Sequence, residues 1–181
     1  MNKIIRQDID TILMEVGISL LSRRLAGKTI LITGAQGLLA AYLVDTIAQL
    51  NHSLHSPCRV VAITRSPVTD KSRLGHLLGN PNILFLFASI GPDFHPPYAH
   101  CDFIVHAAGR SAPRVFTIDP VGTLQVNLAL ETLLEKSRQD EVESLLYFSS
   151  SEIYGSPPDV AIPTPETYWG MTDPLGARSC Y

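Results

Sequence analysis

The sequence is short of cysteines, of charged residues and of long hydrophobic runs, and each shortage excludes a class of protein. The cysteines, at positions 58, 101 and 180, are odd in number and scattered, so no disulfide framework is indicated and a reducing cytoplasm fits best. Only 17% of the 181 residues are charged and 45% are hydrophobic, which excludes an intrinsically disordered chain. The formal net charge of −3 gives no electrostatic reason to expect nucleic acid or an anionic membrane as a partner. Because no run of about 18 apolar residues occurs, no membrane span is predicted.

Residues 1–27 are interpreted as an N-terminal helical extension. Its apolar residues recur at three- and four-residue steps and share one helical face: Ile5, Ile9, Ile12, Leu13 and Val16. Acidic residues interrupt the apolar ones and no cleavage site follows, so a targeting signal is not indicated. We expect the helix to pack onto the domain behind it, with a dimer contact or a membrane-surface helix as alternatives.

From Lys28 onwards, short apolar runs alternate with helical spacing. The runs, each predicted to be a buried strand, are residues 29–33, 59–64, 83–87, 103–106 and 145–148. Helical spacing covers residues 38–50 and 121–138. This alternation predicts an α/β fold over residues 28–181, a doubly wound parallel sheet of the Rossmann type with both faces covered. The proline-rich stretch 156–165 is expected to be a loop.

The turn between the first predicted strand and the helix after it carries glycines in a phosphate-binding pattern. Gly34 allows a tight turn, Gly37 lets the backbone approach a pyrophosphate, and Ala40 permits close packing of helix on strand. A phosphate at this turn also meets the positive N-terminus of the helix. Because the pattern stands between a strand and a helix, it predicts dinucleotide binding, the alternative being an ordinary glycine turn.

The end of the second predicted strand bears on which dinucleotide binds. An acidic residue there would bind the ribose 2′-hydroxyl of NAD, but Thr64, Arg65 and Ser66 occupy the position instead. Arg65 could hold a 2′-phosphate by charge-assisted hydrogen bonds, stack over adenine, or lie in a solvated loop. The sequence therefore favours NADP slightly and leaves NAD open.

Four further motifs, in order along the chain, complete a resemblance to a known family. They are His106-Ala107-Ala108-Gly109 after the fourth predicted strand; Pro120, Thr123, Leu124 and Asn127 in the next helix; Ser149 to Gly155; and the set Glu166, Tyr168, Trp169, Gly170, Pro174, Gly176, Arg178, Cys180 and Tyr181. With the glycine turn, they make the chain resemble the extended short-chain dehydrogenase/reductases, the NAD(P)-dependent sugar-nucleotide epimerases and dehydratases. Within that family the sequence looks most like the UDP-glucuronate decarboxylases.

The resemblance implies a cofactor, NAD or NADP, and residues that contact it. The expected cofactor-binding residues are Gly34, Gln36, Gly37, Leu38, Arg65, Ser89, Ile90, Ala107, Ala108, Gly109, Asn127 and Tyr181. Ala88 and Ser89 stand where relatives usually have Gly-Asp against the adenine, and Arg65 stands where NAD-preferring relatives have an acidic residue.

The resemblance also assigns catalytic and substrate-binding residues. Tyr181 lies where the family has its catalytic tyrosine, Ser150 where it has the partner hydroxyl, and Glu152 where it has an active-site glutamate. Substrate contacts are expected from Ser111, Phe116, Ser151 and Glu152. Phe116 replaces a tyrosine that decarboxylases place near the sugar. Ser151 lies where 4,6-dehydratases carry an acidic aspartate, and because serine cannot be that acid, dehydration is disfavoured.

The implied function is NAD(P)-dependent modification of a nucleotide-linked sugar, most like UDP-glucuronate decarboxylation with oxidation at C4. A 4-epimerase, 4,6-dehydratase or 4-ketoreductase is the alternative, and a dinucleotide-binding module without catalysis is an alternative of another class. The expected partners are a nucleotide sugar, in particular a UDP-sugar, and a second copy in a homodimer of the full-length protein. The family motif is Y-x-x-x-K and Tyr181 is the last residue, so we expect an N-terminal portion of a longer enzyme, inactive alone.

No metal site is predicted. His52, His55 and Cys58 have ligand-like spacing, but they lie in a loop without a fourth ligand. His106, at a strand end, is expected to be a packed, hydrogen-bonded histidine.

Overall fold

The computed structural model describes residues 1–96, 100–110, 112–170 and 175–176. Within them, five parallel strands form one sheet in the order β3-β2-β1-β4-β5. The strands are β1 (Thr29–Thr33), β2 (Arg59–Thr64), β3 (Ile83–Phe87), β4 (Phe103–His106) and β5 (Ser144–Tyr147). The predicted α/β fold is confirmed, and each predicted strand is present to within one residue at either end. The prediction that all five are buried is wrong for β3 and β5, which lie at the two edges of the sheet and whose residues are mostly half-buried or exposed.

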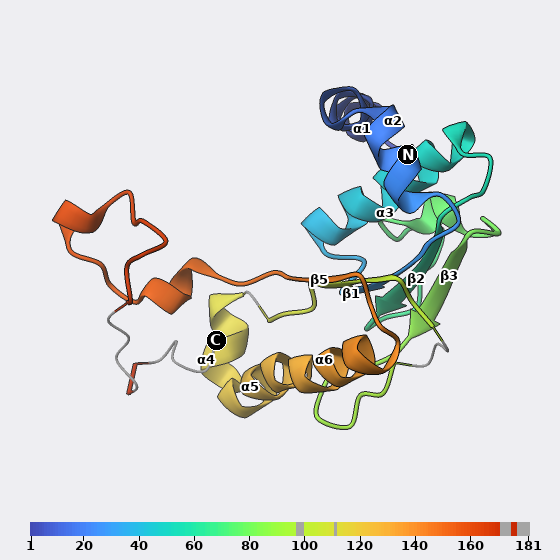
Figure 1. The fold of residues 1–181 in the computed structure, drawn as a ribbon. Coiled ribbons are helices and arrows are strands. Elements are labelled where there is room, and N and C mark those ends of the chain that lie inside the picture. Colours follow the sequence, from blue (N-terminus) through green and yellow to red (C-terminus); the bar gives the residue numbers. More distant parts are fainter. Residues whose placement is uncertain (97–99, 111, 171–174, 177–181) are drawn as a thin grey trace.

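Helices cover both faces of the sheet, because alternate strand residues point to opposite sides. Helix α3 (Leu38–Leu50) covers one face, where Val44 packs into a core with Ile30 and Ile32 of β1. On the other face, α6 (Leu130–Gln139) contributes Leu133 to a core with Leu31. Figure 1 shows these two helical layers above and below the sheet. Because helices cover both faces, a ligand can reach the sheet at the ends of its strands.

The segment between β4 and β5 differs from its prediction. It forms α4 (Pro113–Ile118), which the sequence did not predict, and the single helix expected over 121–138 is two, α5 (Pro120–Leu128) and α6. Ala129 separates α5 from α6, and its N–H bonds the carbonyls of Asn127 and Gln125 in a tightened turn. Proline begins both α4 and α5, since the missing N–H belongs to the first turn, where no intrahelical acceptor exists. Apolar spacing continued across Ala129, so periodicity alone could not locate the break.

The N-terminal residues form two helices, α1 (Lys3–Val16) and α2 (Ile18–Leu25), that lie beside α3 (Figure 1). Ile9 and Leu13 are buried against Leu50 of α3, and the Tyr42 hydroxyl donates a 2.7 Å hydrogen bond to Asp8. The expectation that this helix packs onto the following domain is confirmed. The remaining face of the pair is exposed, with Met14 76% accessible.

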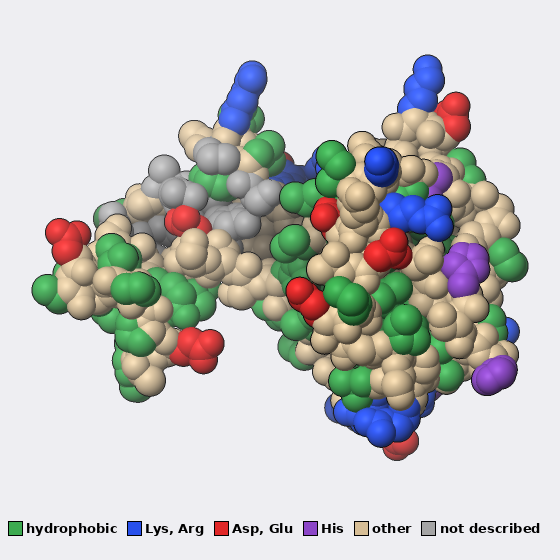
Figure 2. Space-filling model, turned by 90° about the horizontal axis from the view of Figure 1, so that it is seen from above, with side chains coloured by type: hydrophobic (Ala, Val, Ile, Leu, Met, Phe, Trp, Pro, Cys, Tyr) green, Lys and Arg blue, Asp and Glu red, His purple; other side chains and the backbone are tan. Residues whose placement is uncertain are grey.

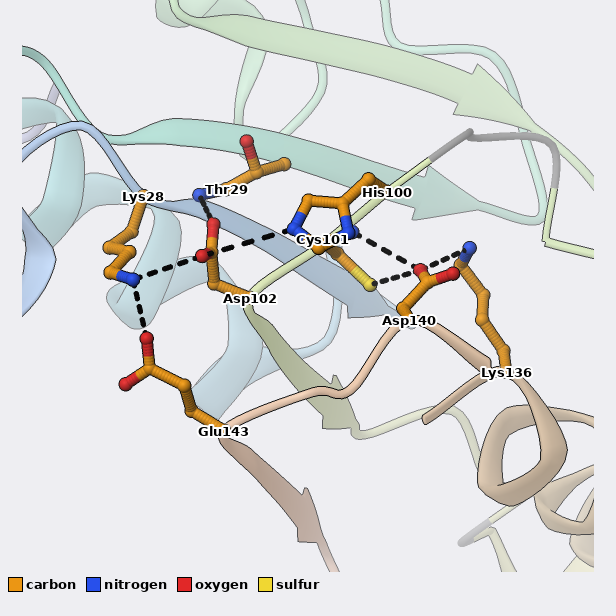
Figure 3. Close-up of polar contacts among 8 residues, drawn as sticks. All are labelled: Lys28, Thr29, His100, Cys101, Asp102, Lys136, Asp140 and Glu143. Atoms are coloured by element: carbon orange, nitrogen blue, oxygen red, sulfur yellow. Dashed lines mark hydrogen bonds and ion pairs between the residues drawn. The ribbon is translucent and has the colours of Figure 1, made fainter. Parts of the chain in front are cut away.

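Polar contacts join the N-terminal ends of the strands (Figure 3). The Asp102 carboxylate accepts hydrogen bonds from the Thr29 backbone N–H at 2.8 Å and from Lys28 Nζ at 3.1 Å, and Lys28 also pairs with Glu143. These residues precede or begin β1, β4 and β5. Burial acts to raise the pKa of Asp102, but the Thr29 and Lys28 hydrogen bonds outweigh it and lower that pKa. These contacts tie the N-terminal ends of β1, β4 and β5 together.

Beyond β5, residues 149–170 project away from the sheet (Figure 1). This projecting segment contains two short 3₁₀ turns, Ser151–Tyr154 and Asp159–Ala161, and the predicted proline-rich loop. Figure 2 shows it standing apart from the body, with hydrophobic side chains on its surface; Val160 is 96% and Trp169 99% exposed. In the described part of the chain, no helix combines the length and apolar character needed to cross a membrane.

Candidate functional site

A cavity of about 390 Å³ lies at the carboxyl ends of the strands, where ligands bind in open α/β sheets. Its volume falls within the range of about 300–1,000 Å³ typical of small-molecule sites. We call it the strand-end cavity. It is lined by Gly34, Gln36, Gly37, Ile63, Thr64, Arg65, Ser66, Ala88, Ser89, Ile90, Ala107, Ala108, Gly109, Arg110 and Val126. No lining residue is acidic, so the cavity suits an anionic ligand.

The glycine turn after β1 forms one wall of the strand-end cavity. Gly34 has φ +65°, a left-handed conformation, and a Cβ there would lie 2.7 Å from the Ala107 carbonyl oxygen. The Gly37 N–H donates a 2.8 Å hydrogen bond to the Gly34 carbonyl, and Gly37 is the N-cap of α3, where no side chain caps the helix. The first N–H groups of α3 therefore lack both intrahelical acceptors and a capping side chain, which is the arrangement that binds phosphate.

The ends of β2 and β3 form a second wall. Arg65 and Ser66 follow β2 directly, and the Ser66 carbonyl accepts hydrogen bonds from Gln36 Nε2 at 3.0 Å and from the Thr64 hydroxyl at 2.8 Å. Arg73 Nη1 donates to the Gln36 carbonyl at 2.9 Å. These contacts fasten the loop after β2 to the glycine turn and hold Arg65 at the cavity.

The segment after β4 forms the third wall, and its last lining residue is an arginine. Ala107, Ala108 and Gly109 lie against the Gly34 turn, and Arg110 follows them. Arg110 pairs with Asp119, whose carboxylate also accepts the Gly122 N–H at 3.0 Å and so caps α5. The Arg110 guanidinium and the Gly122 N–H hold the pKa of Asp119 below its usual value.

His106 supports this wall from beneath. Its Nδ1 lies 2.6 Å from the Thr33 hydroxyl oxygen, which accepts the Ala108 N–H at 3.3 Å, and its ring stacks on Tyr147 with centroids 5.5 Å apart. The hydrogen bond between Nδ1 and the Thr33 hydroxyl holds the imidazole in place next to the start of the Ala107–Gly109 segment. Burial lowers the pKa of His106 to about 4. This histidine is packed and hydrogen-bonded, as the sequence predicted.

The structure brings most of the predicted cofactor residues together. Nine line the strand-end cavity: Gly34, Gln36, Gly37, Arg65, Ser89, Ile90, Ala107, Ala108 and Gly109. Leu38 begins α3 with 59% of its side chain exposed, and Asn127 is half-buried in α5 next to the lining residue Val126; neither lines the cavity. Tyr181 lies outside the described residues. Their roles in cofactor binding stay predictions.

The predicted catalytic and substrate-binding residues lie apart from the cavity lining. Ser150 and Glu152 stand where the projecting segment leaves β5, and the Ser150 hydroxyl accepts the Glu152 N–H at 3.2 Å. Ser151 is exposed in the same turn. Phe116 is 2% exposed, so as it stands its ring offers no surface to a sugar. Ser111 lies outside the described residues, and the role of each remains a prediction.

Sequence reasoning did not place six lining residues among its cofactor contacts: Ile63, Thr64, Ser66, Ala88, Arg110 and Val126. Thr64, Ser66 and Ala88 adjoin predicted residues at the ends of β2 and β3, so including every residue at a strand end would have found them. Arg110 follows Ala107-Ala108-Gly109 directly, and the same rule finds it. Val126 enters from α5 through tertiary packing, and no local pattern signals it.

The described residues hold neither a cluster of metal ligands nor a reactive cysteine thiol. Among residues 1–96, 100–110, 112–170 and 175–176, no three His, Cys, Asp or Glu side chains are grouped so as to hold a metal ion. Burial raises the pKa of the Cys58 thiol to about 12 and that of Cys101 to about 11, so neither is a thiolate nucleophile near neutral pH.

A nicotinamide dinucleotide fits the residues present. The glycine turn supplies close backbone approach and free helix N–H groups for a pyrophosphate, and the absence of acidic lining avoids repulsion. Arg65 and Arg110 add positive charge on either side of the turn.

UDP-glucuronic acid decarboxylases are among the curated proteins that this chain resembles. UDP-glucuronic acid decarboxylase 1 of Xenopus tropicalis is 32% identical over 156 residues, which are 85% of this chain and 34% of the relative. UDP-glucuronic acid decarboxylase 6 of Arabidopsis thaliana is 31% identical over 154 residues, 84% of this chain and 41% of the relative. The chain thus spans between a third and two fifths of the length of these relatives.

Solved structures share the fold. An epimerase from Methanothermobacter thermautotrophicus superposes with a TM-score of 0.65 at 22% identity, over 86% of this chain and 44% of its own. UDP-glucose 4-epimerase from Bifidobacterium longum, solved in complex with NAD⁺ and UDP, superposes with a TM-score of 0.53 at 22% identity. The superposition covers 73% of this chain and 40% of the epimerase chain.

A family model that describes the NAD dependent epimerase/dehydratase family matches residues 30–181, which include all of the sheet except Thr29 and the whole lining of the strand-end cavity. The resemblance read from the motifs is thereby confirmed, and the chain belongs to the NAD dependent epimerase/dehydratase family.

Proposed function

We propose that this chain is the dinucleotide-binding part of an enzyme that oxidises a nucleotide-linked sugar at C4. The observation that carries the proposal is the convergence of the glycine turn, the β2 end and the Ala107–Gly109 segment on one cavity without acidic lining. Membership of the family and its decarboxylase relatives supports a sugar nucleotide as substrate.

The cofactor is proposed to be NADP in preference to NAD. Arg65 lines the cavity directly after β2, where an acidic side chain would repel a 2′-phosphate, and a guanidinium can bind that phosphate with two hydrogen bonds. Titration of the wild type and of Arg65→Asp with both dinucleotides tests this assignment. We expect the substitution to weaken NADP⁺ binding at least tenfold more than NAD⁺ binding; an equal change for both would remove Arg65 from the 2′-phosphate site.

The proposed substrate is a nucleotide-linked hexuronate, in particular UDP-glucuronate. The bound dinucleotide supplies the acceptor for the hydride that leaves C4. Tyr181 would take the proton of the 4-hydroxyl, which leaves a ketone at C4 and a carboxylate at C5, a β-keto acid. Loss of carbon dioxide leaves its bonding electrons on the C4 oxygen, and the Ser150 hydroxyl would donate to that developing oxyanion. Glu152 would contact the sugar.

Decarboxylation is preferred to dehydration because Ser151 stands in the position of the acid that protonates a leaving hydroxyl. A serine hydroxyl cannot supply that proton near neutral pH. The projecting segment that carries Ser150, Ser151 and Glu152 is attached directly after β5, next to the strand-end cavity's β4 wall.

Incubation of the full-length protein with UDP-glucuronate and NAD⁺ or NADP⁺, read by mass spectrometry, tests the proposal. The expected products are carbon dioxide and a UDP-pentose or its 4-keto form. Tyr181→Phe should abolish turnover, and Glu152→Gln should impair turnover while leaving dinucleotide affinity within about twofold, because a residue at the sugar does not touch the cofactor phosphates.

Other results would replace the proposal. If UDP-glucuronate is returned intact or epimerised while a neutral hexose nucleotide is consumed, the enzyme is an epimerase or ketoreductase. If dinucleotide binds and no sugar nucleotide changes, the protein is a binding module without catalysis.

A further inference from the structure

Among the described residues that line the strand-end cavity, Arg110 is the only charged one on the β4 side. It follows Ala107-Ala108-Gly109, whereas the other lining cation, Arg65, follows β2. In the strand order β3-β2-β1-β4-β5, the glycine turn after β1 lies between the two arginines. The cavity therefore has a positive charge on each side of the turn that is shaped to receive a pyrophosphate.

The Arg110 side chain is held in a fixed place. Its Nη1 pairs with Asp119, which is itself anchored because it accepts the Gly122 N–H at 3.0 Å. Only 26% of the Arg110 side chain is exposed. A guanidinium has five N–H donors, and the contact with Asp119 engages Nη1, so a bound anion can be met by the others without breaking the pair.

Gly122 makes room for this arrangement. A Cβ at that position would lie 2.7 Å from Arg110 Nη1 and 2.3 Å from Asp119 Oδ2, distances too short for nonbonded atoms. Any larger residue in this turn of α5 would push the guanidinium or the carboxylate out of place. The glycine, the aspartate and the arginine together fix a cation at the cavity wall.

We propose that Arg110 binds the pyrophosphate of the dinucleotide, opposite the glycine turn, and that Asp119 orients it. The inference rests on the proposed dinucleotide function and deepens it, because it divides the work between two arginines. Arg65 reads the 2′-phosphate and so distinguishes NADP from NAD, whereas Arg110 contacts phosphates common to both. Charge-assisted hydrogen bonds between guanidinium and phosphate are short, strong and frequently bidentate.

The test is a set of calorimetric titrations with NAD⁺, NADP⁺ and ADP-ribose, which has the pyrophosphate without the nicotinamide. Arg110→Gln should weaken binding of all three by a similar factor of about tenfold or more, the loss typical of a charge-assisted hydrogen bond. Arg110→Lys should recover part of the affinity, because a lysine retains the charge without the planar fork. Arg59→Gln, at an exposed arginine on the opposite edge of the sheet, is the matched control and should change none of them.

Asp119→Asn separates ligand binding from a purely structural ion pair. This substitution removes the negative charge that pairs with Arg110, and the asparagine side chain can still cap α5. If Arg110 binds phosphate and Asp119 orients it, Asp119→Asn should weaken dinucleotide binding by no more than about threefold, because the asparagine carbonyl oxygen can still accept from Arg110, whereas Arg110→Gln should lose about tenfold or more. If the pair only fastens the loop to α5, both variants should lower the melting temperature equally and neither should lose dinucleotide affinity selectively, which would overturn the proposal.

The remaining outcomes are also decisive. Loss of NAD⁺ binding in Arg110→Gln without loss of ADP-ribose binding would place Arg110 at the nicotinamide and overturn the assignment. Unchanged dinucleotide affinity with weakened binding of UDP-glucuronate would assign Arg110 to the substrate carboxylate instead. A wild-type chain that is folded and binds none of the three would contradict the proposed function itself, whereas wild-type binding with an unaffected Arg110→Gln contradicts only this inference.

Discussion

At the scale of single residues, Gly34 carries two constraints at once. Its φ of +65° disfavours any side chain, and a Cβ would meet the Ala107 carbonyl oxygen at 2.7 Å. The close approach joins the β1 turn to the β4 end, and both line the strand-end cavity. A sequence pattern predicts the glycine, but only the fold reveals that the residue opposite it is Ala107.

Gly34→Ala should therefore destabilise the chain by about 2–4 kcal/mol, from left-handed strain plus displaced backbone. Dinucleotide affinity should also be lost. Gly79→Ala is the matched control, since Gly79 has φ +81° with nothing within 4 Å of a Cβ, and it should cost only about 1 kcal/mol. Urea unfolding measures both; equal losses would mean that the contact with Ala107 is unimportant.

His106 makes the folding free energy depend on pH in a defined window. Burial lowers its pKa from an ordinary 6.5 to about 4 in the folded chain. Between these values the unfolded state binds the proton and the folded state does not, so the stabilisation is complete above pH 6.5 and is lost as pH falls through 4. The unfolding free energy of the wild type should decline over that interval.

His106→Phe should remove this part of the pH dependence, because a phenyl ring cannot be protonated. It should also cost about 1–3 kcal/mol at pH 7, since the buried Thr33 hydroxyl loses its hydrogen-bond partner. His55→Gln, at an exposed histidine, should leave the profile of the wild type unchanged. Urea unfolding at half-unit pH steps from 4 to 7.5 gives the comparison, and a profile for His106→Phe as steep as the wild type's would refute the assignment.

At the scale of elements, apolar runs located the strands, including the partly exposed edge strands β3 and β5, whereas tertiary packing decided what the sequence missed. All five strands are apolar runs between turn residues, and they were predicted within one residue. The break at Ala129 leaves no trace in the apolar spacing, and α4 is too short to show a period. Nine residues that line the strand-end cavity were predicted from motifs at strand ends, whereas Val126 reaches it from α5 through tertiary packing.

Helix α1 is fastened to α3 through a small buried cluster, so one substitution should test its contribution. Ile9 is fully buried, and Ile9→Ala should lower the unfolding free energy by about 2–4 kcal/mol. Ile4→Ala, in the same helix at a side chain 65% exposed, makes the same chemical change and should stay within about 0.5 kcal/mol of the wild type. Similar values for the two would mean that α1 is not docked on α3 in solution.

At the scale of the whole molecule, the two ends of the parallel strands differ in structure. The N-terminal edge is closed by Asp102, Lys28 and Glu143, which join three strands. The carboxyl edge keeps a cavity whose walls come from the loops after β1, β2, β3 and β4. We therefore expect a ligand at the cavity to leave the contacts at the N-terminal ends of the strands undisturbed.

The most direct test of the central claim is an NMR titration of the ¹⁵N-labelled chain with NADP⁺ and NAD⁺. Binding at the strand-end cavity predicts that the backbone amide signals of residues 34–38, 64–66 and 107–110 shift with ligand concentration, while those of Thr29, Asp102 and Glu143 stay in place. Absence of any shift in a folded chain, or shifts confined to the N-terminal edge or to the projecting segment, would contradict the assignment of this cavity to a nicotinamide dinucleotide.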